Sequence, residues 1–307
     1  KNIIVIGSGY MGQEYLKVLK KMNLLKNTQV YSKTLKNYSN LLKLFKLELK
    51  NFHTIHEKNL FTHAIVCVNE YEIFKVVKKL INLKIKYILV EKPGGANIKE
   101  LISLNNFAAK NKCHLNVAYN RRYYENILYL KKIFKNEKVK SAHFSFTEWI
   151  DKIKLLKYKK KITLNWFHYN SLHLIDLVFY LIGLPEKISA KAGGNDKKFG
   201  RTLFSGSGIT KKSIYFSYHS NWESAGRWSI DLFTTKNRYI LSPLEEIKIQ
   251  KKNEININRV KLKLKFDNKF KPGIYLITQN FLKNKKTLLY KDYIKLFRLY
   301  NIISRGN

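Results

Sequence analysis

The chain has few cysteines and no long apolar run. Only two of its 307 residues are cysteines, Cys67 and Cys113, and both lie in apolar segments. Neither has a second cysteine or a histidine at metal-ligand spacing, so we expect buried free thiols, no metal site and a reducing, cytoplasmic location. No run of about 18 uncharged apolar residues exists, which excludes a membrane-spanning helix. The first apolar run, IIVI, has four residues and leads into glycines, so we expect no signal peptide.

Acidic residues and arginines are also scarce. Asp and Glu number 21 against 59 Lys and Arg, which gives a formal net charge of +38, yet only eight of the basic residues are arginines. Arginine is the usual reader of bases and phosphates, and the lysines are spread along the whole chain. We therefore expect a solvated lysine surface and no specific nucleic-acid partner, with a nucleic-acid-associated protein as the alternative. A basic surface also attracts an anionic cofactor or substrate.

Residues 1–119 alternate short apolar runs with helical patterns. Strands are expected at 2–6, 29–32, 64–68, 87–90 and 114–118, and helices at 10–22, 35–49, 71–81 and 98–110. Strands that alternate with helices form a doubly wound parallel sheet. The fold class is therefore α/β, and residues 1–119 are expected to form a Rossmann domain.

The pattern changes after residue 120. Helices are expected at 124–134, 172–181 and 292–303, and alternating strands at 139–149, 214–222, 228–234 and 260–266, with a loop or a pair of hairpins at 193–208. Alternation with one apolar face suits an antiparallel sheet that is covered on one side. Residues 120–307 are thus expected to form a C-terminal α+β domain with a large, mostly antiparallel sheet that binds substrate and joins protomers.

A glycine-rich turn follows the first expected strand. The sequence KNIIVIGSGYMG places Gly7, Gly9 and Gly12 in a Gly-x-Gly-x-x-Gly pattern between a β-branched strand and a helix. In this pattern the first glycine permits the tight turn, the second lets a pyrophosphate approach the backbone, and the third lets helix and strand pack closely. The helix that follows directs its N-terminal amides at the phosphates.

The end of the second expected strand bears on the choice of dinucleotide. An NAD site usually has Asp or Glu there, against the ribose 2′-hydroxyl. This chain reads VYSKT, and Ser32, Lys33 and Thr34 suit a 2′-phosphate instead. We expect NADP, with NAD possible and with Lys33 as an ordinary surface lysine as the alternative.

Four segments in order resemble one family. A strand ends in Glu91-Lys92-Pro93 followed by two glycines, Asn120-Arg121-Arg122-Tyr123 follows the fifth strand, His173 and Asp176 lie on an apolar helix, and residues 271–282 read KPGIYLITQNFL. With the N-terminal glycines, this order resembles the Gfo/Idh/MocA oxidoreductase family over nearly the whole chain.

The resemblance implies a Rossmann domain followed by an α/β domain, and redox chemistry at a sugar, cyclitol or sugar-nucleotide carbon. It implies that Lys92 hydrogen-bonds the reacting oxygen, that Pro93 follows a cis bond, and that His173 exchanges the proton of the substrate hydroxyl. A lysine at a strand's carboxyl end, partly buried beside a cationic ring, has a lowered pKa and suits proton relay. The expected cofactor-binding residues are Gly7, Gly9, Tyr10, Met11, Gly12, Ser32, Lys33, Val68, Asn69, Glu91 and Lys92.

The chain departs from the family at two places. Family dehydrogenases often carry Asp four residues before the histidine, where this chain has Tyr169. Tyr169 or the adjacent His168 then serves as the acid, or the site is remodelled or inactive. The region Val68-Asn69-Glu70 also lacks the Thr-Pro-Asn often seen there.

Substrate contacts are expected from residues near this helix and at the domain junction. They are Arg121, Arg122, Tyr123, Trp166, Asn170 and Asp176. One arginine suits a substrate carboxylate or phosphate, and the other a structural ion pair. Trp166 either stacks on a sugar or nicotinamide or packs in the core. Asp176 lies three residues after His173 and is placed to orient it.

Together these features predict an NAD(P)-dependent oxidoreductase that acts on the CH–OH group or ketone of an anionic sugar or sugar nucleotide. The alternatives are an inactive cofactor-binding regulator of the same fold and a reductase of a non-sugar substrate such as a tetrapyrrole or imine. We expect a homo-oligomer, dimer or tetramer, formed through the C-terminal sheet.

Overall fold

Two compact units make up the chain. A computed structural model describes residues 1–34, 36–56, 60–285 and 287–307. The first unit consists of Lys1–Tyr123 and Lys265–Lys295, and the second of Tyr124–Leu264 and Leu296–Asn307. The structure thus differs from the expected division into 1–119 and 120–307, because a late segment returns to the first unit.

The first unit contains a seven-stranded sheet of order β15-β6-β5-β4-β1-β2-β3. Its strands are β1 (Ile3–Ile6), β2 (Thr28–Ser32), β3 (Leu49–Asn51), β4 (His63–Val66), β5 (Tyr87–Glu91), β6 (His114–Ala118) and β15 (Leu288–Leu289). All are parallel except β15, which pairs antiparallel with β6. Every residue of β1 is buried, as expected for a parallel strand whose two faces are both covered.

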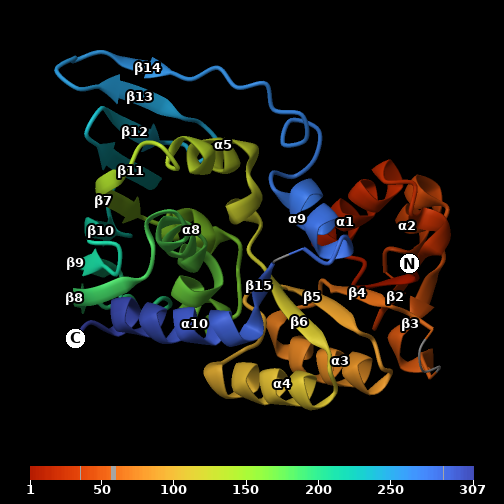
Figure 1. The fold of residues 1–307 in the computed structure, drawn as a ribbon. Helices are drawn as coiled ribbons and strands as arrows, with labels where there is room; N and C mark the ends of the chain where they lie inside the picture. Colours follow the sequence, from red (N-terminus) through yellow and green to blue (C-terminus); the bar gives the residue numbers. More distant parts are fainter. Residues whose placement is uncertain (35, 57–59, 286) are drawn as a thin grey trace. The chain divides into compact units, whose positions relative to one another are not determined.

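Helices cover both faces of this sheet. They are α1 (Tyr10–Lys21), α2 (Tyr38–Phe45), α3 (Glu70–Asn82), α4 (Ile98–Lys110) and α9 (Ile274–Leu282), with short turns η1 (Leu25–Asn27), η2 (Phe52–Thr54) and η3 (Asn120–Tyr123). Figure 1 shows α1, α2 and α9 on one face and α3 and α4 on the other. The side chain of Asn69 caps α3 by accepting from the Glu72 amide at 3.2 Å.

Hydrophobic burial explains why residues 265–295 belong to the first unit. Ile274, Ile277 and Phe281 of α9 are buried in the same cluster as the β1 residues and the apolar face of α1. Burial of a large aliphatic or aromatic side chain contributes about 1.5–3 kcal/mol. The segment predicted from its resemblance to a late family element is therefore part of the core of the Rossmann unit.

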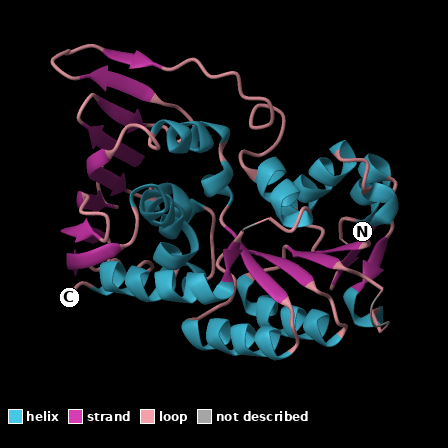
Figure 2. Ribbon diagram, in the orientation of Figure 1, coloured by secondary structure: helices cyan, strands magenta, loops and turns pink. Residues whose placement is uncertain are grey.

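The second unit is built on an eight-stranded sheet of order β14-β13-β12-β11-β7-β10-β9-β8. Its strands are β7 (Val139–Phe146), β8 (Pro185–Gly193), β9 (Leu203–Thr210), β10 (Tyr215–Asn221), β11 (Trp228–Thr234), β12 (Asn237–Leu241), β13 (Lys248–Lys251) and β14 (Ile257–Arg259). The β7–β10 pair is parallel and the others are antiparallel. Figure 2 distinguishes these strands from the helices beside them.

Alternation along the strands separates a covered face from an exposed one. Phe216 and Tyr218 of β10 are buried, whereas Tyr215 and Ser217 are exposed. The covered face carries aromatic side chains, and the rings of Phe144 and Tyr218 stack with centroids 5.3 Å apart. The helices of this unit are α5 (Glu125–Ile133), α6 (Ile150–Leu155), α7 (Lys160–Leu164), the π-helical turn η4 (Phe167–Ser171), α8 (Leu172–Ile182) and the last part of α10 (Tyr290–Arg305).

The α/β fold class with a parallel N-terminal sheet and a mostly antiparallel second sheet is confirmed. Two expected elements differ. The helix at 35–49 is α2 alone, because Lys46 adopts a left-handed conformation, and Leu49 opens β3; residue 35 lies outside the described residues. Residues 260–266 are irregular rather than a strand. Their alternation of lysines and apolar residues is typical of a strand, but a strand also needs a neighbouring strand to pair with. The region 193–208 contains the end of β8 and most of β9.

Candidate functional site: a nucleotide cavity and a second-unit cluster

The glycine turn after β1 has the geometry that its sequence predicts. Gly7 has φ of +107°, which favours glycine, and it joins β1 to the start of α1. A Cβ on Gly12 would lie 2.0 Å from the Gly7 carbonyl oxygen, so any larger residue would push helix and turn apart. A Cβ on Gly9, by contrast, would meet nothing within 4 Å. The turn is therefore closely packed on its inner side and open beside Gly9.

Hydrogen bonds fix the turn so that the helix start stays accessible. The Gly7 amide donates to the Tyr31 carbonyl at 2.8 Å. The Ser8 carbonyl accepts from the side-chain amides of Asn37 at 2.8 Å and Gln13 at 3.1 Å. Gly9 caps α1, whose first turn has no acidic residue. The first backbone amides of this helix have no intrahelical partners and carry a partial positive charge, which suits a phosphate.

A cavity of about 680 Å³ opens at this turn. Its lining residues come from the ends of β1, β2 and β4 and from neighbouring helices: Ile6, Gly7, Ser8, Gly9, Ser32, Lys33, Thr34, Lys36, Asn37, Phe52, His53, Cys67, Val68, Asn69, Glu72, Lys75 and Val76. The carboxyl edge of a doubly wound sheet is where such folds bind nucleotides. Six predicted cofactor residues meet in this cavity, namely Gly7, Gly9, Ser32, Lys33, Val68 and Asn69.

The end of the cavity near β2 is rich in cations. Among the described residues that line the cavity are the cations Lys33, Lys36 and Lys75 and one carboxylate, that of Glu72. The Lys33 ammonium lies 3.3 Å from that carboxylate and remains largely exposed. Sequence reasoning found Lys33 but missed Lys36, His53 and Lys75. Lys36 could have been found from its closeness to the strand end, whereas the other two come from distant segments and carry no local signal.

Five other predicted cofactor residues are not among the described residues that line the cavity. Tyr10 is 65% exposed at the start of α1, and the Lys271 ammonium lies 4.7 Å from its ring centroid. Met11 packs against the core cluster, and Gly12 is buried under Gly7. The remaining two, Glu91 and Lys92, end β5 at the carboxyl edge of the same sheet.

Glu91 is buried and Lys92 is half-buried, and the Lys92–Pro93 bond is cis. Burial lowers the pKa of Lys92 to about 8; Glu91 opposes the shift, and the positive charges of Arg121 and Lys271 reinforce it. The Tyr15 hydroxyl donates to Glu91 Oε1 at 2.7 Å. Burial raises the pKa of the Glu91 carboxyl, which Tyr15 and Lys92 counteract. Lys92 is thus an amine that changes protonation near neutral pH, as proton relay requires.

The three residues predicted at the domain junction differ in how deeply they are buried. Arg121 and Arg122 of η3 are half-buried, and the charge of Arg121 acts on Lys92. Tyr123 is buried in the core cluster of the first unit, where its ring contributes to packing.

The remaining predicted residues lie in the second unit around η4 and α8. Tyr169 is half-buried within the π-helical turn, and His173 follows on α8 with 6% exposure. The Trp166 ring packs against Tyr158 and Phe199, which fits the expected core role. Asp176 is buried and accepts a hydrogen bond from the Tyr300 hydroxyl at 2.8 Å, so it is held by a distant tyrosine.

The neighbouring His168, an alternative acid, contacts Asn301. Its Nε2 lies 2.8 Å from Asn301 Oδ1, and its ring stacks on Phe297 with centroids 5.1 Å apart. Burial lowers the pKa of His168. The imidazole is therefore neutral at pH 7 and packed within the unit.

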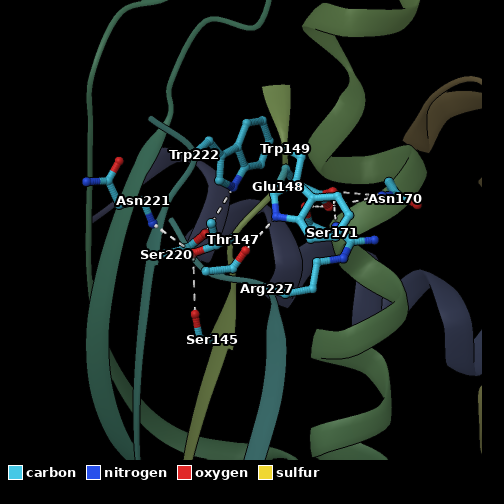
Figure 3. Close-up of polar contacts among 11 residues, drawn as sticks. Ser145, Thr147, Glu148, Trp149, Asn170, Ser171, Ser220, Asn221, Trp222 and Arg227 are labelled. Carbon is cyan, nitrogen blue, oxygen red and sulfur yellow. Dashed lines mark hydrogen bonds and ion pairs between the residues drawn. The ribbon is translucent and has the colours of Figure 1, made fainter. Parts of the chain in front are cut away.

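Asn170 takes part in a cluster that sequence reasoning missed (Figure 3). Its side-chain amide lies 3.0 Å from each carboxylate oxygen of Glu148, and the Ser171 hydroxyl donates to Glu148 Oε1 at 2.8 Å. Arg227 donates to Glu148 Oε2 at 3.2 Å. Glu148 comes just after β7 and Arg227 just before β11, so only the folded sheet brings them together.

Neither a metal site nor a membrane span is present in the part of the chain that the structure describes. No group of three or more His, Cys, Asp or Glu side chains there is arranged to hold a metal ion. Likewise, no described helix has both the length and the hydropathy needed to cross a bilayer.

Comparison with known proteins identifies the first unit. Residues 1–119 match the Gfo/Idh/MocA family, described as an oxidoreductase family with an NAD-binding Rossmann fold. Residues 1–119 are therefore similar to the NAD-binding Rossmann domain of that family. No curated protein sequence matches the chain.

Solved structures share the fold of this chain over nearly its whole length. An oxidoreductase from Agrobacterium radiobacter, in complex with NAD+, L-tartaric acid and magnesium, is 14% identical with a TM-score of 0.75, covering 97% of this chain and 94% of its own. UDP-N-acetylglucosamine 3-dehydrogenase GnnA from Acidithiobacillus ferrooxidans is 10% identical with a TM-score of 0.74, covering 99% and 97%. The WlbA dehydrogenase from Chromobacterium violaceum, in complex with NADH and UDP-GlcNAcA, is 14% identical with a TM-score of 0.72, covering 98% and 92%.

Proposed function

We propose that this protein is an NADP-dependent oxidoreductase that moves a hydride between nicotinamide C4 and an alcohol or ketone carbon of a sugar or sugar nucleotide. The observation that carries the proposal is the cavity at the glycine turn, open beside Gly9 and lined by Lys33, Lys36 and Lys75. Its volume, its helix N-terminus and its cations fit a dinucleotide with an additional phosphate.

The cofactor preference can be measured directly. Three lysines against one carboxylate favour a 2′-phosphate over a ribose hydroxyl, since a phosphate carries charge that the lysines neutralise. We expect calorimetry to give tighter binding of NADPH than of NADH, with a preference that weakens as salt is added. Equal affinities would leave NAD as the cofactor, and no affinity for either would refute the proposed function.

Lys92 is the residue we assign to the reacting oxygen. The bound nicotinamide supplies the hydride donor or acceptor, and the protein manages the proton. With a pKa of about 8, Lys92 holds a proton for a forming alkoxide or accepts one from an alcohol. The nearby charge of Arg121 makes it the junction arginine we assign to an anionic part of the substrate, with Arg122 in a structural pair.

His173 and Tyr169 are the second-unit residues proposed for proton exchange with the substrate. A histidine is suited to this role because its pKa lies near neutrality. Tyr169 stands where family dehydrogenases often have Asp, and its hydroxyl donates a proton only during reduction. We therefore expect Tyr169→Phe to slow carbonyl reduction and Tyr169→Asp to speed alcohol oxidation, measured in both directions with the same sugar pair.

The substrate class rests on analogy with the similar structures. GnnA is named for UDP-N-acetylglucosamine, and WlbA is complexed with UDP-GlcNAcA. A stopped-flow assay with NADPH and a panel of keto-sugars and keto-sugar nucleotides tests the proposal, and oxidation of NADPH in one turnover supports it.

A cofactor-binding regulator is the second candidate, and Tyr169 in place of the family aspartate is what favours it. Such a protein binds NADPH but does not oxidise it with any member of the panel. Tight binding without turnover would therefore replace the enzyme assignment while keeping the cofactor assignment.

Two further parts of the proposal concern assembly and location. The exposed face of the second sheet, which includes Leu203 and Tyr215, is the surface we assign to a second copy of the chain. Light scattering with Tyr215→Glu tests it, and a lower oligomeric mass is expected. Cys67 and Cys113 are free thiols, which suits the cytoplasm.

A further inference from the structure

Glu148 is a carboxylate with almost no access to solvent. Its side chain is 1% exposed, and burial raises the pKa of its carboxyl group while Ser171 and Arg227 oppose that shift. An isolated buried charge is costly unless hydrogen bonds and an opposite charge compensate it. Asn170, Ser171 and Arg227 supply that compensation. Glu148 therefore holds the side chains of these three residues in fixed positions.

Arg227 is the cation that Glu148 holds. Its side chain is 46% exposed, and its guanidinium carbon lies 4.8 Å from the ring centroid of Trp149 and 4.9 Å from that of Trp228. Figure 3 shows Arg227 beside Trp149 and close to Asn170 and Ser171. The Trp149 indole N–H donates to the Gly226 carbonyl at 2.7 Å, which fixes that ring next to the arginine.

The guanidinium is thus half-exposed yet held at one place. Its contact with Glu148 uses NH1, and a guanidinium has five N–H groups in a planar fork. Such a fork binds a carboxylate or a phosphate through two parallel hydrogen bonds. Because Glu148 and the two indoles already restrict the side chain, a ligand would lose little entropy in ordering it.

The charge around Trp149 also favours an anion. The Lys152 ammonium lies 4.4 Å from the Trp149 ring centroid. Two cations, Arg227 and Lys152, therefore lie against the Trp149 ring, and Glu148 pairs with Arg227. Both cations reach solvent, and Arg227 is the one that Glu148 holds.

This arginine is connected to the candidate proton-exchange residue. The Trp228 ring lies 6.5 Å from the ring of His173, centroid to centroid. Asn170 and Ser171, bound to Glu148, immediately precede the helix that carries His173. All of these residues belong to the second unit.

We infer that Arg227, held by Glu148 and flanked by Trp149 and Trp228, binds an anionic oxygen group of the substrate, a carboxylate or a phosphate. The inference rests on the proposed function for the identity of the molecule, and it names the part of that molecule that the second unit recognises. Glu148 acts as a positioning residue for Arg227 and for the turn that leads to His173.

Calorimetry with a matched pair of ligands tests the inference. UDP-N-acetylglucosamine and UDP-GlcNAcA share the diphosphate and differ in the sugar carboxylate. If Arg227 binds the carboxylate, the wild-type protein with NADPH prefers UDP-GlcNAcA, and Arg227→Met weakens that ligand about tenfold or more while leaving the other unchanged. If Arg227 binds the diphosphate, the variant weakens both ligands equally.

Arg238→Met is the matched control. Arg238 also pairs with a carboxylate, Asp231 at 2.8 Å, and lies over an aromatic ring, that of Phe233. Strand alternation places Asp231 and Phe233 on the face of β11 opposite to Trp228. Its loss is expected to leave both affinities unchanged.

Arg227→Lys provides a second variant if the methionine variant does not fold. It keeps the charge and loses the planar fork, so an intermediate affinity is expected. Unchanged binding of both ligands by folded Arg227 variants, or no binding of either ligand by the wild-type protein, overturns the inference. Failure of the proposed function would show separately, as a loss of NADPH binding or of NADPH oxidation in the absence of any change at Arg227.

Discussion

The candidate cofactor site and the candidate substrate site are built in different ways. The first depends on backbone conformation and on small residues that are close in sequence, since Gly7, Gly9 and Gly12 shape the turn. The second depends on side chains from three separate segments, since Glu148, Asn170 and Arg227 meet only in the folded sheet. A binding site made of backbone tolerates change in the surrounding sequence, whereas a site made of paired side chains changes its ligand when one partner is replaced.

The largest expected effect is a loss of turnover that leaves cofactor binding unchanged. Lys92→Met should lower turnover about 10²–10⁴-fold, because proton transfer at the reacting oxygen is lost, while NADPH affinity stays the same. In the wild-type protein, alcohol oxidation should rise and carbonyl reduction fall as pH passes about 8, since the neutral amine accepts and the ammonium donates. Steady-state rates and calorimetry measure both.

Lys271→Met sharpens the same test. The Lys271 charge lowers the pKa of Lys92, so its removal should move the midpoint of the pH profile upward. An unchanged midpoint, together with normal turnover in Lys92→Met, would contradict the role assigned to Lys92.

The next effect concerns how much the Glu148 cluster contributes to the free energy of unfolding. Glu148→Ala leaves the buried Ser171 hydroxyl and the Asn170 amide without their acceptor and should lower the free energy of unfolding by about 1–3 kcal/mol. Asp151→Ala removes an exposed carboxylate three residues away and should change it by less than about 0.5 kcal/mol. Urea unfolding measures both, and equal values would mean that the Glu148 cluster contributes no more than a surface pair.

A pair of glycine variants tests the backbone site. Gly12→Ala should lower the free energy of unfolding by about 1–3 kcal/mol and weaken NADPH binding, because its Cβ overlaps the Gly7 carbonyl. Gly9→Ala should cost less than about 1 kcal/mol of stability, as the N-cap of α1, and mainly weaken NADPH binding, since its Cβ projects into the open space beside the turn. If Gly9→Ala binds NADPH normally, the dinucleotide does not lie against this turn.

The smallest effect concerns the cations of the cavity. Lys33→Gln combined with Lys36→Gln should weaken NADPH binding about tenfold, or about 1.4 kcal/mol for the two lost charges together, and leave NADH binding unchanged. Lys43→Gln, on α2 and not among the residues that line the cavity, serves as the control. Parallel losses for both dinucleotides would remove the 2′-phosphate assignment.

The sequence predicts the parallel sheet and the cofactor turn well because their signals are local. β6 and α4 have the bounds that apolar periodicity predicts, and the roles of Gly7 and Gly12 follow from neighbouring residues. The short strands β3 and β15 escape such reasoning, because two or three residues carry no period and depend on their neighbours for pairing.

The second site is harder to predict for a physical reason. Glu148 reads as one acid after a strand and Arg227 as one base before another, and 79 positions separate them. Their partnership depends on the register in which Trp228 of β11 pairs with Phe146 of β7. Asn170, predicted to contact substrate, is bound by Glu148 in the structure, and Asp176 accepts a hydrogen bond from the distant Tyr300, and neither partner could be found from local sequence.

The return of residues 265–295 to the first unit determines how the protein can be recombined. The polypeptide passes from one unit to the other at three points, so the nucleotide half is not a contiguous cassette. A chimera that exchanges residues 1–123 alone would place a foreign sheet beside the native α9. The apolar side chains of α9 pack against β1 and α1 of this chain and would not match the foreign surface. Transplanting the Rossmann unit therefore requires that both of its segments are exchanged together. A fragment that ends at Tyr123 would expose to solvent the hydrophobic surface that α9 covers.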